Sequence, residues 1–346
     1  MSSWEKTVIH RRFRREDKAA VISLLRGTFD DWNGDWAERY WEWKFEQNPH
    51  GAARIWVGDD DGRIAGCYIW TPVQLRFDGA TLLGAESVDA AVHRDYRGQG
   101  VFTKLARAAV EDESTAELAL VYAFPVEGAY GGQVRVGFAP WTPVAGIARP
   151  LLSAPIRRRR FPDLALAETA QFDSRFEAFS NGRSDWELTV QHDADYLQWR
   201  YRKHPSRTYG TIACERDGEI TGYCVLTLDP TPRRLTRGYI VDLQVLPKSG
   251  ETAAFLVDHA LRRLRAGGAR VAISWLRPSG LEREALESFG FSSRYQTVRR
   301  LLKRDPYVPQ FLVFESHAGE LDDLLARRGA RGQPRWSLVP GDSDSI

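Results

Sequence analysis

The stretch that decides the fold of this chain is VHRDYRGQGVF, residues 92–102. An apolar segment at 83–93 precedes it and a segment with helical periodicity at 101–113 follows it, so we expect a strand to enter it and a helix to leave it. The first backbone N–H groups of a helix have no partner inside the helix, and the helix dipole adds positive charge there. Gly98 and Gly100 let a ligand approach this backbone without a Cβ in the way. The stretch therefore predicts a loop that binds a diphosphate.

Other nucleotide-binding motifs fit this loop less well. A dinucleotide fingerprint needs a third glycine at 103, where the chain has Thr103. A P-loop that starts at Gly98 needs Gly-Lys at 103 and 104, and only Lys104 matches. A string of this kind can also form a tight turn that binds nothing. Its place between a strand and a helix favours the anion site, to which Arg97 adds a charged donor.

An internal repeat indicates a duplicated unit. Three stretches recur 156 residues later: YWEWKF at 40–45 as YLQWRY at 196–201, Pro49 as Pro205, and DGRIAG at 61–66 as DGEITG at 217–222. Two further pairs recur 153 residues later: Val88-Asp89 as Val241-Asp242, and Gly137-Phe138 as Gly290-Phe291. Chance matches scatter in spacing, whereas a fixed period marks repetition of one structural unit.

The length of 346 residues suits two domains of this size. We predict an α/β fold of the α+β type with a mixed sheet, in two tandem domains at 1–155 and 163–304, followed by a C-terminal extension at 305–346. The first unit is predicted in the order βααβββαβαβ. Its strands are expected at 8–13, 54–57, 63–70, 83–93 and 118–124, near the turn 78–79 and from 138 onward. Its helices are expected at 17–29, after the cap Asp35, at 101–113 and at 127–136.

Composition excludes several classes of protein. The chain has 48 basic and 46 acidic residues, a net charge of +2, which argues against a nucleic-acid or membrane-surface partner. No apolar run approaches the ~20 residues of a membrane span, and no signal-peptide core is recognised, so a cytoplasmic location is expected. The cysteines lack metal-site spacing, and no metal is predicted. The basic run at 157–160 is interpreted as a solvated linker.

With these motifs and this element order, the chain resembles the GNAT superfamily of acyl-coenzyme A-dependent acetyltransferases. The motif of that family is Arg or Gln, two residues, Gly, one residue, then Gly or Ala. Arg97 and Gly100 match it, and Phe102 departs from the small residue expected. The resemblance covers about residues 7–150, and the repeat extends the fold to about 163–300, as in tandem proteins of this family. It implies acetyl-CoA, or another acyl-CoA, as co-substrate. The residues implied to hold it are Ala91, Val92, Arg97, Gly98, Gln99, Gly100, Val101 and Phe102.

Catalysis of acyl transfer to an amine requires a base, because an alkyl amine with a pKa of ~10.4 is protonated near neutrality. Glu86 is the candidate, eleven residues before Arg97, a spacing that resembles the catalytic glutamate of histone-type members. Strand alternation predicts that Glu86 shares a face with Val88, Ala90 and Val92, and that Asp89 lies on the other face in a structural role. The alternative is that Glu86 is a surface carboxylate at a strand end.

Two further roles follow from the resemblance. Backbone donors around Ala91 and Val92 are expected to stabilise the oxyanion of the tetrahedral intermediate. Tyr130, in the helix after the buried strand, is the candidate that protonates the leaving thiolate, although Gly131-Gly132 could disrupt that helix.

The second unit has lost these features. The offset of 153 places Gly250 where the first unit has Arg97, Glu251 in place of Gly98 and Ala253 in place of Gly100. Tyr239 corresponds to Glu86. We therefore predict that the second domain does not bind coenzyme A in the same manner, and that it shapes the acceptor cleft or serves as a scaffold.

The sequence predicts an N-acetyltransferase that moves an acetyl or other acyl group from acetyl-CoA to a primary amine of a small molecule or peptide. A hypothesis for the acceptor is that the acidic, tryptophan-containing stretch 30–36 binds a cationic amine. Two alternatives stay open: an aminoacyl or peptidyl transferase that uses charged tRNA, and a non-catalytic acyl-CoA sensor or scaffold. The sequence predicts no oligomeric state.

Overall fold

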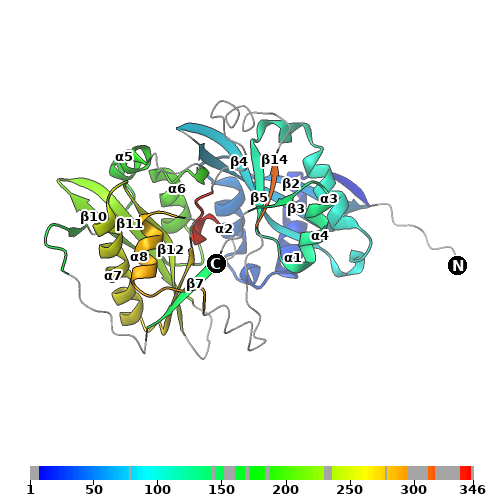
Figure 1. Cartoon of the computed structure of the whole chain (residues 1–346). Coiled ribbons are helices and arrows are strands. Elements are labelled where there is room, and N and C mark those ends of the chain that lie inside the picture. Colours follow the sequence, from blue (N-terminus) through cyan, green and yellow to red (C-terminus); the bar gives the residue numbers. More distant parts are fainter. Residues whose placement is uncertain are drawn as a thin grey trace.

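The structure is a computed structural model that describes residues 8–77, 79–141, 145–151, 160–167, 171–183, 188–229, 236–276, 279–294, 311–315 and 336–343. Two lobes lie side by side in Figure 1, each built on one β-sheet. The linker residues 157–159 and most of the predicted extension 305–346 fall outside the described residues.

The first lobe contains a mixed sheet in the order β1-β2-β3-β4-β5-β14-β6, with β9 paired to the far end of β3. Its strands are β1 (Ile9–Arg12), β2 (Arg54–Asp60), β3 (Arg63–Phe77), β4 (Ala80–Val92), β5 (Leu120–Ala123), β6 (Ala139–Pro140), β9 (Leu188–Val190) and β14 (Leu312–Glu315). Its helices are α1 (Lys18–Arg26), α2 (Ala37–Trp41), α3 (Val101–Val110) and α4 (Glu127–Val134). Apolar clusters fill both faces of the sheet: one faces α1 and α2, and the other faces α3 and α4.

The second lobe repeats this plan with the order β7-β13-β12-β11-β10-β8. Its strands are β7 (Ala145–Pro150), β8 (Ala165–Ala167), β10 (Gly210–Arg216), β11 (Glu219–Leu228), β12 (Arg237–Val245) and β13 (Val271–Leu276). Its helices are α5 (Ser174–Gly182), α6 (Ala194–Leu197), α7 (Gly250–Ala266) and α8 (Leu281–Ser288). The predicted fold class, two tandem domains with mixed sheets, is therefore confirmed.

The two sheets exchange strands. β7 follows the first unit in the chain, yet it pairs antiparallel with β13 in the second sheet. β14 comes after the second unit, yet it pairs with β5 and β6 in the first sheet. Figure 1 shows β14 beside β5 in one lobe and β7 with the other lobe. The two sheets therefore contain strands from both sides of the predicted domain boundaries at 155, 163 and 304. The boundaries themselves stay a prediction.

The repeat has a structural centre where the lobes meet. A π-helical turn follows α2 at Glu42–Glu46, and its copy follows α6 at Gln198–Arg202. Trp43 and Trp199, 156 residues apart, stack with ring centroids 4.9 Å apart and an interplanar angle of 19°. The indole N–H of each donates to the backbone carbonyl of the other, at 2.8 and 2.7 Å. The two copies of the unit therefore contact each other through the same residues.

Local details differ from the sequence expectations at the second helix. α2 begins at Ala37 after Trp36, and no side chain caps it, so Asp35 does not have the predicted capping role. Asp35 is exposed. The three cysteines are free and buried, as three small apolar fillers would be.

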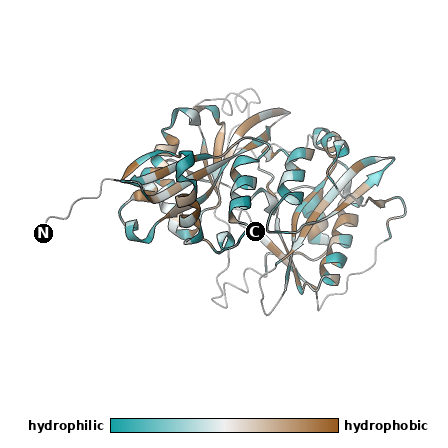
Figure 2. Ribbon diagram, turned by 180° about the vertical axis from the view of Figure 1, so that it is seen from behind, coloured by the Kyte–Doolittle hydropathy of each residue, from teal (hydrophilic) through white to brown (hydrophobic). Residues whose placement is uncertain are grey.

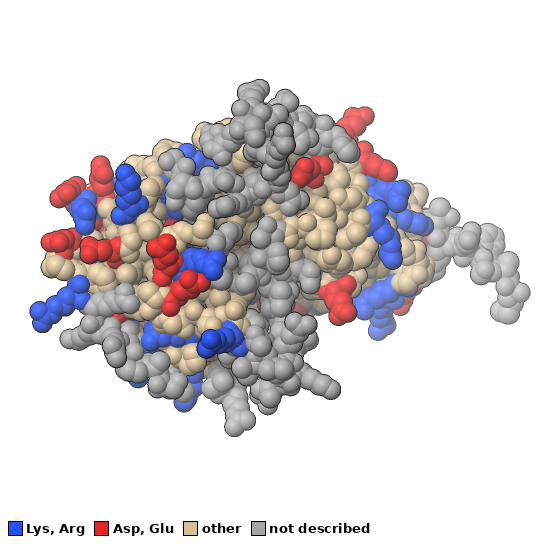
Figure 3. All heavy atoms as spheres, viewed as in Figure 1, with Lys and Arg blue, Asp and Glu red and all other residues tan. Residues whose placement is uncertain are grey.

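Apolar residues concentrate in the strands and on the inner helix faces, as the brown segments in Figure 2 show. On the face drawn in Figure 3, basic and acidic side chains are interspersed. No helix among the described residues is long and apolar enough to cross a membrane.

Candidate active site

The loop at 97–100 has the backbone that the glycines were expected to allow. Gly98 and Gly100 both have φ of +77°, a region that L side chains rarely adopt, and α3 starts directly after Gly100. A Cβ on either glycine would meet nothing within 4 Å, so the space in front of the loop is open. Among the described residues, the backbone N–H groups of residues 98–103 find no acceptor. These donors at a helix N-terminus fit the diphosphate of acyl-CoA.

Contacts around the loop fix its shape. Gln99 Nε2 donates to the carbonyl of Asp95 at 2.9 Å, and Arg97 Nε donates to the carbonyl of Val92 at 3.1 Å. Arg63 bonds the Asp95 carboxylate at 2.7 Å and lowers the pKa of that carboxyl group. Arg97 itself is exposed. These hydrogen bonds therefore fix the conformation of the loop in the absence of a ligand.

Phe102, the residue that departs from the family motif, is accommodated by a glycine. Its ring packs edge-on against Tyr68, with centroids 5.7 Å apart. A Cβ at Gly132 would lie 2.4 Å from the Phe102 ring, so only glycine fits opposite it. α4 runs unbroken through Gly131 and Gly132, so the glycines that could have disrupted that helix do not do so. Val101 is 3% exposed and packs in the core, so only its backbone can face a ligand.

A β-bulge in β4 changes the predicted faces of that strand. Ile69 pairs with Val88 and Cys67 pairs with Ala91, so β4 has one residue more than β3 between these pairs, and Asp89 has φ of +44°. Val88 packs in the cluster that faces α1 and α2, on the face of β4 that it was expected to share with Glu86. Ala90 and Val92 pack instead in the cluster that faces α3 and α4. The predicted alternation was wrong beyond Val88, because a bulge shifts every later side chain to the opposite face.

Asp89 was also assigned to the wrong face. Its carboxylate forms an ion pair with buried Lys44, on the π-helical turn after α2, and accepts a bond from Trp32 Nε1 at 3.3 Å. Trp32 is 1% exposed, so its indole is not available to stack on an acceptor, whereas Trp36, the other indole of the stretch 30–36, is half-buried. Asp31 and Asp35 are exposed, and their part in acceptor binding stays a prediction.

β4 and β5 separate next to Glu86. The parallel pairing runs from Gly84–Leu120 to Ser87–Ala123, where β5 ends. The last five residues of β4, including Ala91 and Val92, therefore extend beyond β5. Backbone groups released in this way can bind an extended ligand as a strand would. The predicted oxyanion donors lie in this stretch.

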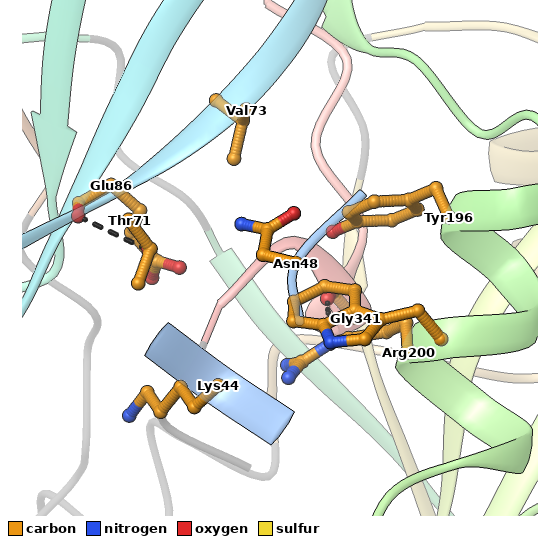
Figure 4. Close-up of a pocket in the computed structure, with 9 residues that line it drawn as sticks. Lys44, Asn48, Thr71, Val73, Glu86, Tyr196, Arg200 and Gly341 are labelled. Carbon is orange, nitrogen blue, oxygen red and sulfur yellow. Dashed lines mark hydrogen bonds between the residues drawn. The ribbon is translucent and has the colours of Figure 1, made fainter. Parts of the chain in front are cut away.

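Glu86 is half-buried and lines a small pocket between the lobes (Figure 4). The first lobe contributes Lys44, Asn48, Thr71, Val73 and Glu86 to this pocket. The second contributes Tyr196, Trp199 and Arg200, and Gly341 comes from near the end of the chain. Glu86 is thus a pocket residue rather than a solvated strand-end carboxylate.

Tyr130 lies on α4 and is half-buried against the cluster that faces α3 and α4. Glu86 and Tyr130 therefore belong to opposite faces of the first sheet. The sheet separates the two residues near the point where β5 ends and β4 continues. The structure gives no contact between them, and their catalytic roles stay predictions.

The pocket residues of the second lobe were not predicted as site residues. In the sequence, the stretch with Tyr196, Trp199 and Arg200 was used only as evidence for the internal repeat. A signal was present, because Arg200 repeats Lys44 and both positions keep a basic residue in an otherwise aromatic segment. Gly341 carried no signal, since its position depends on contacts with distant parts of the chain.

The loop of the first lobe has no copy in the second. α7 begins at Gly250, the position that corresponds to Arg97, so the residues aligned with the loop form the first turn of a longer helix. Glu251 is in that first turn, and Thr252 is buried. This geometry agrees with the prediction that the second domain lacks the same anion site.

Comparisons with known proteins assign the class. Residues 10–139 match the family described as "Acetyltransferase (GNAT) domain". The chain thus contains an acyltransferase domain of the GNAT type over residues 10–139. A search of curated proteins finds no match.

Solved structures with the same fold include two bacterial proteins and one from yeast. A probable N-acyltransferase of Enterococcus faecalis V583 has a TM-score of 0.66 and 13% identity, covering 90% of this chain and 73% of that one. A GCN5-related N-acetyltransferase of Anabaena variabilis has a TM-score of 0.61 and 14% identity over 89% and 72%. The N-myristoyltransferase of Saccharomyces cerevisiae with bound myristoyl-CoA has a TM-score of 0.54 and 13% identity over 91% and 84%.

Proposed function

We propose that this protein transfers an acyl group, acetyl in the first instance, from acyl-CoA to a primary amine of a small molecule or peptide. The observation that carries the proposal is the row of N–H groups at 98–103 that find no acceptor within the described part of the chain, next to strand ends that separate beside Glu86. The match of residues 10–139 to an acetyltransferase domain supports it.

The residues divide the chemistry as follows. The loop amides and Arg97 bind the diphosphate, and the free end of β4 aligns the pantetheine arm. Acyl-CoA supplies an activated acyl group in its thioester. Glu86 accepts the proton of the amine, whose nitrogen then bonds the acyl carbon while the bond from carbon to sulfur breaks. Tyr130 gives a proton to the departing thiolate.

The acceptor amine is proposed to enter the pocket between the lobes. Glu86 faces this pocket from β4, while Lys44 and Arg200 line it. Its walls also hold Tyr196, whose pKa is raised well above 10 by burial first and by nearby carboxylates. Tyr196 therefore remains a neutral hydroxyl that can hydrogen-bond an acceptor at every working pH.

Calorimetry with acetyl-CoA tests the loop. Gly100→Glu should weaken binding at least about 100-fold, because a carboxylate then faces the phosphates. Gly62→Glu is the matched control, since Gly62 also has positive φ, +86°, with nothing within 4 Å, but lies in the β2–β3 turn. Equal loss in both variants, or wild-type protein that takes up no acyl-CoA, refutes the proposal.

Thiol release with a panel of amines tests the transfer. Turnover that depends on an amine supports an N-acyltransferase, whereas binding without turnover indicates a sensor or scaffold. Transfer from charged tRNA in the absence of acyl-CoA would indicate the aminoacyl transferase alternative.

A further inference from the structure

A segment near the end of the chain runs through the interior. Residues 336–343, called the strap here, are all buried, and Figure 1 shows them in red between the lobes. A single buried connection must satisfy its backbone polar groups away from water, so a strap of this kind needs many specific partners.

Both lobes supply these partners. In the first sheet, Ser337 N donates to the carbonyl of Leu188 on β9 at 2.9 Å, and Tyr122 Oη on β5 donates to the carbonyl of Asp342 at 3.0 Å. From the second lobe, Arg200 donates through Nε to the carbonyl of Gly341 at 3.0 Å and through Nη2 to that of Ser343 at 2.7 Å. The strap thus bridges the strand beside Glu86 and the helical turn that lines the pocket.

A buried ionic cluster holds the strap at Asp342. His192 Nε2 lies 2.6 Å from Asp342 Oδ1, and His192 Nδ1 lies 3.1 Å from Asp242 Oδ2. Burial by itself lowers the pKa of His192, but the attraction of Asp242 and Asp342 outweighs it and raises the pKa to about 10. An imidazolium with a carboxylate on each ring nitrogen is a fixed link, because loss of either partner leaves a buried charge.

Only glycine fits at position 341 of the strap. A Cβ at Gly341 would lie 1.9 Å from Tyr201 Oη and 3.2 Å from the carbonyl of Val241. In Figure 4, Gly341 lies with Tyr196 and Arg200, across the pocket from Glu86 and Thr71. The strap therefore forms part of the pocket wall that faces Glu86.

We propose that His192 and Asp342 are positioning residues, which hold the strap as the wall of the acceptor pocket opposite Glu86. The acceptor then binds only while the strap stays in its buried position. The second lobe contributes to the reaction through the contact of His192 with Asp342. This inference rests on the proposed function, because it takes the pocket at Glu86 to be the acceptor site.

Asp342→Asn tests the link by removing the charge and retaining the shape. Glu282→Gln is the matched control: Glu282 is also buried, accepts from a cation, Arg183, at 2.9 Å, and accepts a backbone N–H, that of Val245, at 3.1 Å. We expect Asp342→Asn to raise the acceptor KM about 10-fold with the affinity for acyl-CoA unchanged. Glu282→Gln should leave both constants unchanged. An acceptor KM that moves equally in both variants, or in neither, overturns the inference.

Hydrogen exchange gives a readout that needs no turnover. Peptides that contain residues 336–343 should exchange faster in Asp342→Asn than in Glu282→Gln, because release of the link lets the strap open locally. Equal exchange overturns the inference. Should Asp342→Asn fail to fold, Tyr122→Phe removes a single bond to the strap and should show the same effects on a smaller scale.

The two proposals fail in different ways. Wild-type protein that binds no acyl-CoA refutes the proposed function, and the inference with it. Wild-type protein that transfers acyl groups, but whose acceptor KM is indifferent to Asp342→Asn, refutes the inference alone.

Discussion

The two lobes share one plan, yet only the first has the open loop before its central helix. In the first, Gly98 and Gly100 adopt positive φ and α3 begins after them. In the second, α7 starts at the position of Arg97, and Glu251 is in its first turn, where it meets the positive end of the helix dipole. The comparison teaches that four residues decide whether the segment before the central helix is an open loop or the first turn of the helix, while the sheet beneath it stays the same.

The largest expected effect concerns the strand that precedes the central helix of each lobe. Glu86→Gln should lower kcat about 100-fold or more, because the amine loses its general base. Tyr239, its counterpart on β12, should be replaceable by Phe with activity unchanged. Steady-state kinetics with saturating acyl-CoA measures both. Activity that persists in Glu86→Gln would show that Glu86 is not the general base. Loss of activity in Tyr239→Phe would show that the two halves differ less than we propose.

The centre of the repeat comes next. Trp43→Ala and Trp199→Ala should each cost ~3–5 kcal/mol of the free energy of unfolding, as for other buried large-to-small changes. The double variant should cost less than the two single costs together, because the rings stack on each other and exchange hydrogen bonds. Urea unfolding measures the three values. Full additivity would mean that the two residues act independently.

A smaller effect is expected where α3 meets α4. Gly132→Ala should cost ~1–3 kcal/mol of the free energy of unfolding, because the added Cβ would lie 2.4 Å from the Phe102 ring. Gly131→Ala is the control on the same helix: nothing lies within 4 Å, and alanine favours a helix by up to ~1 kcal/mol. Chemical denaturation of both variants separates the clash from the helix effect. The second lobe has Phe255 and Ala285 at the positions corresponding to Phe102 and Gly132, so this requirement belongs to the first lobe alone.

The smallest effect is a pH dependence of stability. Because folding raises the pKa of His192 from 6.5 to about 10, its contribution is complete below pH 6.5 and is lost as pH rises toward 10. Asp242 on β12, Asp342 on the strap, Tyr223 on β11 and Tyr196 on α6 surround the ring.

The difference in free energy of unfolding between wild-type protein and Asp342→Asn should therefore shrink from pH 6 to pH 9.5. The difference for Glu282→Gln should stay constant, since Arg183 does not titrate there. Denaturation at the two pH values measures both. A difference for Asp342→Asn that grows with pH contradicts the assignment of a charged His192.

Local chemistry made much of this molecule predictable. The glycines of the loop, the hairpin turns and the fixed period of the repeat are each written in a few neighbouring residues, and the element order followed from them. The bulge at Asp89 was missed because the apolar pattern of β4 reads equally well with or without one extra residue. The strand exchange and the strap were missed because they depend on pairing between distant segments, such as Leu312–Glu315 with β5.

The exchanged strands bear on how such a protein can be divided or recombined. Each sheet is completed by a strand that lies outside its own unit in the chain: β14 protects the edge of β5, and β7 that of β13. A cut between the two units, between residues 151 and 160, would leave an unpaired sheet edge in each product, and exposed edges invite aggregation. The halves are thus interlocked, and a hybrid with a related protein should fold only when both crossing strands come from the same parent as the sheets they complete.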